Sequence, residues 1–206
     1  MKKTLFTLPL QLLLLCALCV AASAQSDLGP QNGASKTTSS SQLNLSANAV
    51  RGIQLDISSA PGGVTVTGAT GRSSTGVFAL DFGDVDGLGL VTPAPGVSAS
   101  VSASGATYTT PVHLTPIFSG FSSGTASVSV LLDPTAGTAA GRAAAREGSG
   151  ANSVVNPSST ATVFTSSAAS GTTLTRYVGV FVSNANGAGA VSGSLASRLI
   201  YQVVVP

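Results

Sequence analysis

Apolar and polar residues alternate at a period of two along several short segments of this chain, which is the pattern of half-buried β-strands. Ile53, Leu55 and Ile57 alternate with polar residues and predict the first strand. The turn sequence at 60–63 and the alternation at 64–67 follow directly. Together they predict a β-hairpin that closes at Gly68.

A further strand is expected over 77–82, where Phe78, Leu80 and Phe82 should face the interior. Glycines and aspartates over 83–89 predict turns after it. Similar patterns predict more strands at 97–102, 106–114, 125–132 and 160–165.

The strongest strand signals lie near the carboxyl end of the chain. Residues 173–183 carry apolar side chains on both parities, which is typical of a central strand. Residues 195–205 close the sequence with Leu199, Tyr201 and Val203 on one parity. We expect this terminal segment to pair within a sheet.

One segment has a different pattern, because 136–147 (AGTAAGRAAARE) is rich in alanine, the best helix former. It predicts a short helix or helical turn. Its apolar side consists of alanines alone, so we expect an insertion between strands rather than part of the core. The whole pattern predicts an all-β fold, an immunoglobulin-like or pilin-like antiparallel β-sandwich with a short Ala-rich helical insertion.

The first 24 residues have the three parts of a secretory signal peptide. Lys2 and Lys3 form the basic start, 5–20 is an apolar run, and Ala22-Ser23-Ala24 offers a small-residue cleavage site. We therefore expect a protein that is exported, to the periplasm, the cell surface or the medium. After cleavage we expect no segment that spans a membrane, since nothing downstream is long and apolar enough.

Removing the signal peptide changes the chemistry of the chain. Both cysteines, Cys16 and Cys19, lie within it, and Lys2 and Lys3 account for the net charge of +2. The remaining chain has seven basic and seven acidic residues. A neutral surface has no basis for attraction to phosphate backbones or anionic lipids, so nucleic acid is not an expected partner.

Beyond the signal peptide, the composition predicts two parts. Residues 25–42 (QSDLGPQNGASKTTSSSQ) lack apolar periodicity and predict a flexible Ser/Thr-rich arm. Residues 43–206 are expected to form a single β-sandwich domain. The arm is followed by Asn44-Leu45-Ser46, a glycosylation sequon that matters only where the source glycosylates exported proteins.

A group of aspartates is the one candidate cofactor site in the sequence. Asp81, Asp84 and Asp86 place three carboxylates within six residues, beside glycines, and oxygen donors of this kind bind calcium. Leu88 stands where an EF-hand loop would place its third ligand. Aspartates also stabilise turns by accepting hydrogen bonds from nearby backbone amides, and we weigh this interpretation above calcium.

A catalytic centre is not expected, although Gly120-Phe121-Ser122-Ser123-Gly124 has the G-x-S-x-G form of a hydrolase nucleophile elbow. No helix pattern follows it, and the lone histidine, His113, precedes the serine rather than following it. In a chain this rich in Gly and Ser, the motif arises readily by chance. We expect no enzyme, and labelling of Ser122 by a fluorophosphonate probe would contradict that expectation.

The chain resembles bacterial secreted pilin-like proteins, including fimbrial subunits and the spore coat protein U group. The similarity is carried by the signal peptide, the Ser/Thr-rich arm, Leu80-Asp81-Phe82-Gly83, Gly193 and the closing strand 199–205. It departs from them in lacking a disulfide and in the position of Tyr201, well before the C-terminus. The resemblance implies a structural or adhesive role and assembly by strand addition, in which an extended arm completes the open sheet of another subunit.

The candidate donor positions are Leu43, Leu45, Ile53, Leu55 and Ile57. The alternative is that these residues pair within their own domain. A second functional class remains open, a secreted ligand-binding β-sandwich module that depends on calcium.

Overall fold

The computed structural model describes residues 47, 50–68, 77–186 and 192–206. The expected signal peptide, the arm, the sequon and the positions Leu43 and Leu45 lie outside the described residues. Contacts divide the chain into Met1–Asn48 and Ala49–Pro206, and every element below belongs to the second unit.

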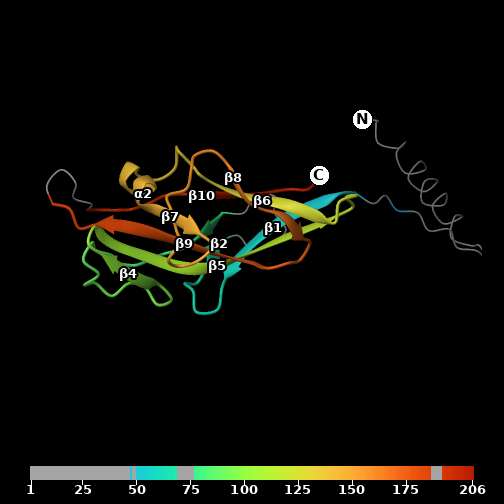
Figure 1. Cartoon of the computed structure of the whole chain (residues 1–206). Helices are drawn as coiled ribbons and strands as arrows, with labels where there is room; N and C mark the ends of the chain where they lie inside the picture. Colours follow the sequence, from blue (N-terminus) through green and yellow to red (C-terminus); the bar gives the residue numbers. More distant parts are fainter. Residues whose placement is uncertain (1–46, 48–49, 69–76, 187–191) are drawn as a thin grey trace, which may run out of the picture. The chain divides into compact units, whose positions relative to one another are not determined.

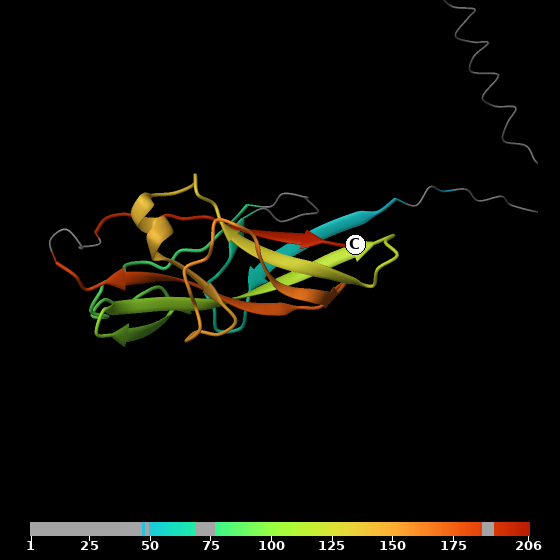
Figure 2. The ribbon, with the colours of Figure 1, turned by 45° about the horizontal axis from the view of Figure 1, so that its top comes forward.

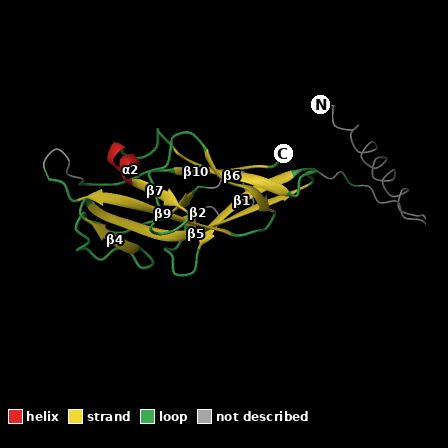
Figure 3. Ribbon diagram, viewed as in Figure 1, coloured by secondary structure: helices red, strands yellow, loops and turns green. Residues whose placement is uncertain are grey.

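The regular elements of the described chain are nearly all β-strands, joined by turns and loops (Figures 1 and 3). Its elements are β1 Gly52–Ser59, β2 Thr67–Gly68, β3 Phe78–Ala79, β4 Ser98–Ser102, β5 Gly105–Ser119, β6 Thr125–Leu132, α2 Ala139–Ala144, β7 Ala145–Gly148, β8 Thr162–Ala169, β9 Leu174–Ser183 and β10 Leu199–Val204. The predicted all-β character is confirmed. No helix in these ranges is long and apolar enough to cross a membrane.

The strands form three antiparallel sheets. The largest has the order β1-β5-β9-β7, with β4 also paired to β5. A second sheet has the order β10-β6-β8, and β2 pairs only with β3. The β10-β6-β8 sheet lies over part of the larger sheet, as the two views in Figures 1 and 2 show.

The strand predictions of the carboxyl half are confirmed. The segment 173–183 becomes β9, a central strand between β5 and β7, and 195–205 contains β10, which pairs with β6. The strand expected at 106–114 is longer than predicted, since β5 runs from Gly105 to Ser119.

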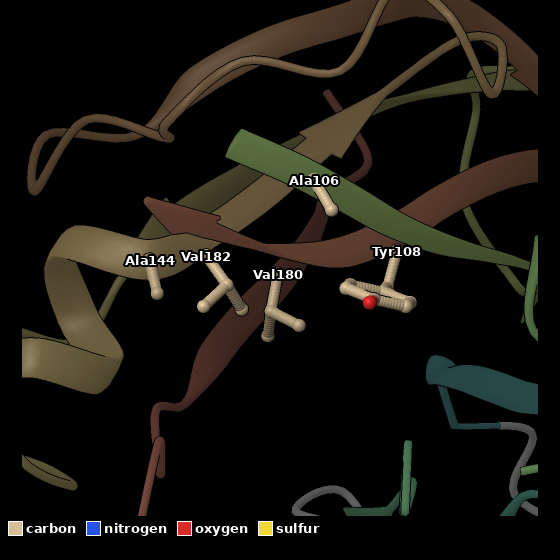
Figure 4. Close-up of a cluster of buried hydrophobic side chains, with 5 residues drawn as sticks. All are labelled: Ala106, Tyr108, Ala144, Val180 and Val182. Atoms are coloured by element: carbon tan, nitrogen blue, oxygen red, sulfur yellow. The ribbon is translucent and has the colours of Figure 1, made fainter. Parts of the chain in front are cut away.

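The core is built on one face of β5. Its even-numbered residues from Ala106 to Phe118 are all buried, whereas Ile117 on the other face is 41% exposed. The residues of β1 and β9 that lie directly opposite these buried β5 residues point to the same face of the sheet, because directly opposed residues share a face. At one end, Ala106, Tyr108, Ala144, Val180 and Val182 form a compact apolar cluster (Figure 4).

Two prolines lie within β5, and the first faces a gap in the pairing. The carbonyl of Pro111 faces Gly63, since a Cβ on that glycine would lie 2.5 Å from it. A strand residue directs its nitrogen and carbonyl to the same side. On this side of β5, the pairing with β4 ends at Thr109 and the pairing with β1 begins at Val112, so Pro111 lies in a gap between the two partner strands. The missing N–H of Pro111 therefore removes no ladder hydrogen bond.

The second proline, Pro116, faces the opposite side of β5. Its carbonyl accepts a hydrogen bond from the N–H of Gly171 at 2.7 Å, so its nitrogen points away from β1. On that side the pairing with β9 ends at Leu114. The Ser170 side chain continues the interaction by bonding both the N–H and the carbonyl of Phe118, each at 2.9 Å.

The predicted hairpin between 53–57 and 64–67 is wrong. β1 pairs with β5 instead, where its aliphatic side chains extend the buried face. The backbone N–H of Val64 donates to the Thr110 hydroxyl at 2.8 Å, and β2 pairs with β3. The strand expected at 77–82 is reduced to β3, although Phe78, Leu80 and Phe82 do face inward as predicted.

The Ala-rich segment is part of the core rather than an insertion, so this expectation is also wrong. The helix α2 ends at Ala144, and the next residues form β7, an edge strand of the largest sheet. Glycine permits this packing, because a Cβ on Gly141 would lie 2.1 Å from the carbonyl oxygen of Ala196. Thr138 caps the helix by accepting a hydrogen bond from the N–H of Gly141 at 2.9 Å.

Candidate functional site

The three aspartates of the candidate calcium site occupy turns between β3 and β4. Asp81 accepts a hydrogen bond from the N–H of Gly83 at 2.9 Å. Asp86 accepts three, from Leu88 at 2.6 Å, Leu90 at 2.9 Å and Val91 at 2.6 Å. Within the described ranges, no three His, Cys, Asp or Glu side chains form a group that could hold a metal ion.

The Asp86 carboxylate is held in its charged form by the backbone around it. Desolvation acts to raise its pKa, but the N–H groups of Leu90, Val91 and Leu88 together lower the pKa below its usual value. The backbone of Asp86 is fixed as well. Its N–H donates to the Tyr108 hydroxyl at 3.2 Å, and the same hydroxyl donates to the Asp86 carbonyl at 2.9 Å. Asp86 therefore organises a loop.

Calcium binding by these aspartates stays the alternative to the turn interpretation, and a calcium titration distinguishes the two. We expect the melting temperature of the wild type to be the same in calcium and in a chelator, because both Asp86 oxygens already accept backbone hydrogen bonds. Asp86→Ala should lower the melting temperature in both buffers, whereas Asp84→Ala, in an exposed turn, should not. A rise with calcium in the wild type that Asp84→Ala abolishes would establish the metal site instead.

The candidate serine and histidine of a hydrolase are not brought together. His113 lies in the middle of β5, opposite Ser58 and Thr175. Ser122 lies in the connection from β5 to β6, which contains no helix. At about 3.3 Å per residue, His113 lies roughly 20 Å from the end of its strand, beyond hydrogen-bond reach of that connection.

A buried charged cluster joins the two larger sheets, and sequence reasoning missed it. The Arg176 guanidinium of β9 donates to both Glu147 oxygens of β7, at 2.6 Å and 2.8 Å. It also lies 4.2 Å from the ring centroid of Phe164 in β8. Tyr201 of β10 packs edge-on against that ring and donates to Glu147 at 3.4 Å. The sequence did contain one indication of this cluster: Arg176 has the same parity as the inward-facing valines of its central strand. A charged side chain that faces the interior requires a buried partner.

The environment of this cluster keeps Tyr201 protonated. Desolvation first, and then the negative charge of Glu147, raise the pKa of the Tyr201 hydroxyl well above its ordinary value. The hydroxyl therefore remains a hydrogen-bond donor to Glu147. Because Arg176 binds Glu147 of β7 and contacts Phe164 of β8, the cluster holds strands of both sheets together.

Several strand edges have no partner strand in the described part of the chain. β1 also has a side without a partner strand and carries the charged Asp56, β4 has five residues, β7 has four residues with a bridge to Val155, and the pairing of β8 with β6 has register shifts. β10 differs from them. It pairs regularly with β6 on one side, and it lies near β1 without being hydrogen-bonded to it.

Comparisons of the chain with protein families, curated proteins and solved structures find no match.

Proposed function

We propose that this chain is an exported, non-enzymatic β-sandwich protein of the fimbrial-subunit kind, with a structural or adhesive role at the cell surface. In this proposal, copies associate by strand addition along β10. The observation that carries it is the unprotected edge of that strand. Natural sheets blunt their edges with charges, prolines, bulges or very short strands.

The β10 sequence, Leu-Ile-Tyr-Gln-Val-Val, contains none of these features. It has six residues and an uninterrupted register with β6. Val204 at its end is 61% exposed. An extended segment from a second copy would find backbone donors and acceptors along this edge, with apolar side chains on both parities.

Fewer residues remain as candidate donors than the sequence suggested. Ile53, Leu55 and Ile57 lie in β1 and pair with β5 of their own chain. Leu43 and Leu45 remain as candidate donor residues, at the end of the Ser/Thr-rich segment that would follow the cleaved signal peptide. Export, a neutral chain without cysteine and the polar arm all agree with an extracellular structural role.

Strand addition predicts that two variants, one changed in the donor segment and one in the acceptor strand, lose assembly equally. In the chain from Gln25 onward, Leu43→Asp with Leu45→Asp should remove the donor. Val204→Lys should protect the acceptor edge, because charged side chains on an edge strand oppose further pairing. Size-exclusion chromatography with light scattering should show multimers for the wild type and loss of multimers for both variants.

Matched controls separate this effect from a general effect of charge. Ser39→Asp with Ser41→Asp adds the same charge to the arm, and Val163→Lys adds the same charge to β8, where Val163 is 57% exposed. Both controls should still form multimers. A wild type that remains monomeric at all concentrations, or a Val204→Lys variant that assembles normally, would contradict strand addition.

A further inference from the structure

The chain enters β1 at the same end of the folded domain at which the open strand β10 ends. β1 begins at Gly52, opposite Ser119 at the end of β5. β10 ends at Val204, opposite Ser127 near the start of β6. Residues 120–124 connect β5 to β6. In both views the C-terminus lies near the start of β1 (Figures 1 and 2). The donor segment that precedes β1 therefore begins its path beside an acceptor edge.

The residues just before β1 do not turn back toward β10. Val50 and Arg51 run past the end of β5, since a Cβ on Gly120 would lie 3.2 Å from the Arg51 Cα and 3.3 Å from the Val50 carbonyl oxygen. Neither residue lies in a turn, and Val50 is 82% exposed. A donor that paired with β10 of its own chain would have to reverse its direction within the few residues before Val50. A connection this short favours exchange between two copies.

The apolar pattern of the donor matches the inner face of β10. The odd-numbered residues of β10 lie opposite Val128, Val130 and Leu132 of β6, which are all buried, and opposed residues share a face. Leu43 and Leu45 are two positions apart, so both point to one face of an extended strand. Paired with β10, the two leucines would extend the buried face of this sheet by one strand.

The length of chain between donor and domain limits where the acceptor can lie. Leu45 precedes Val50 by five positions, which span at most about 17 Å when fully extended. The acceptor strand, with six residues, is itself about 20 Å long. A β10 that receives Leu43 and Leu45 therefore lies against the end of the donor's own domain. Because the donor's own β10 also ends there, the second donor and the second acceptor of the pair come within the same reach.

We propose that strand addition in this protein is reciprocal, so that two copies exchange the segments carrying Leu43 and Leu45 and close into a symmetric dimer. This inference rests on the proposed function and narrows its partner to one other copy of the chain. Each copy supplies a donor to the β10 edge of the other, and a closed two-fold contact leaves no free β10 for a third copy. Once the first exchange has formed, the second is intramolecular and has an effective concentration on the order of millimolar.

The test compares a dimer held by two exchanges with one held by a single exchange. The mass of the wild type from Gln25 onward, measured by light scattering, should rise with concentration to that of a dimer and no further. An equal mixture of the Leu43→Asp, Leu45→Asp variant with Val204→Lys has one working donor and one working acceptor. Its heterodimer should have a dissociation constant about 10²–10⁴-fold higher than the wild-type dimer, because the second exchange is lost. Fluorescence-detected sedimentation velocity measures both constants. A mixture of the charge-matched control variants of the arm and of β8 should dissociate as the wild type does.

The outcomes separate reciprocal exchange from strand addition in general. A wild type that stops at the dimer, with a heterodimer weakened about a hundredfold or more, supports reciprocal exchange. A mass that continues to rise beyond the dimer overturns it and leaves strand addition intact. A heterodimer as stable as the wild-type dimer also overturns it, because each dimer would then contain a single exchange. A wild type that stays monomeric at every concentration overturns strand addition and the exchange together. Thermal melting of each variant checks that the fold is intact.

Discussion

Replacing Arg176 by methionine should lower the free energy of unfolding by about 3–5 kcal/mol, because it leaves the Glu147 carboxylate buried without a partner. The two side chains are only 12% and 5% exposed, so little water is available to solvate the orphaned charge. Methionine keeps most of the aliphatic volume of the arginine. Urea unfolding followed by far-UV circular dichroism measures the change, and the melting temperature should fall with it.

Two companion variants test whether the orphaned charge is the cause. Changing Arg176 and Glu147 together to methionine should recover most of the loss, since a buried ion pair replaced by apolar residues is often neutral or stabilising. Arg198→Met breaks the ion pair with Asp133, but the arginine side chain there is 60% exposed. That change should cost about 1 kcal/mol or less. A double variant as unstable as Arg176→Met would contradict the explanation.

Tyr108→Ala should cost about 3–5 kcal/mol, the usual cost of removing a large aromatic side chain from a core. Tyr108 is 0% exposed and lies among Ala106, Val180 and Val182 (Figure 4). Its hydroxyl also bonds the backbone of Asp86 twice, so the loop at 86–91 should loosen. Urea unfolding measures the first effect, and hydrogen exchange of the amides at 86–91 measures the second.

Tyr108→Phe separates packing from hydrogen bonding. The ring remains, so the loss of stability should fall to about 1–2 kcal/mol for the two hydrogen bonds. Exchange at 86–91 should still accelerate, while amides of β9 opposite Tyr108 should keep their protection. If exchange in the loop were unchanged in Tyr108→Phe, the hydroxyl would not be what holds the loop.

Local pattern was sufficient to predict most strands and insufficient to predict their partners. Alternation of side chains placed β6, β9 and β10 nearly correctly, because each strand buries one face and the period of two is a direct consequence. The predicted pairing of 53–57 with 64–67 failed because β1 pairs along its whole length with β5, some sixty residues away. Alternation with a period of two shows that a segment is a strand but does not identify its partner.

The candidate site shows the same limit. The aspartates were visible in the sequence, and the preferred turn interpretation agrees with the backbone hydrogen bonds of Asp86. The pair of Glu147 and Arg176 was not visible, because its members lie on separate strands and Glu147 was assigned to an insertion. An ion pair across two strands is a property of register, which propensity does not encode.

The two prolines of β5 have a consequence for how the sheet chooses its alignment. Sliding β5 along its neighbours by two residues would keep every apolar side chain on the same face, so hydrophobic burial alone would tolerate the error. Such a slip would bring a proline nitrogen opposite a ladder carbonyl and leave that carbonyl without a donor. Pro111 and Pro116 avoid this only in the observed alignment, where one faces the gap between β4 and β1 and the other the turn before β9. The two prolines therefore restrict this long, apolar strand to a single register with its neighbours.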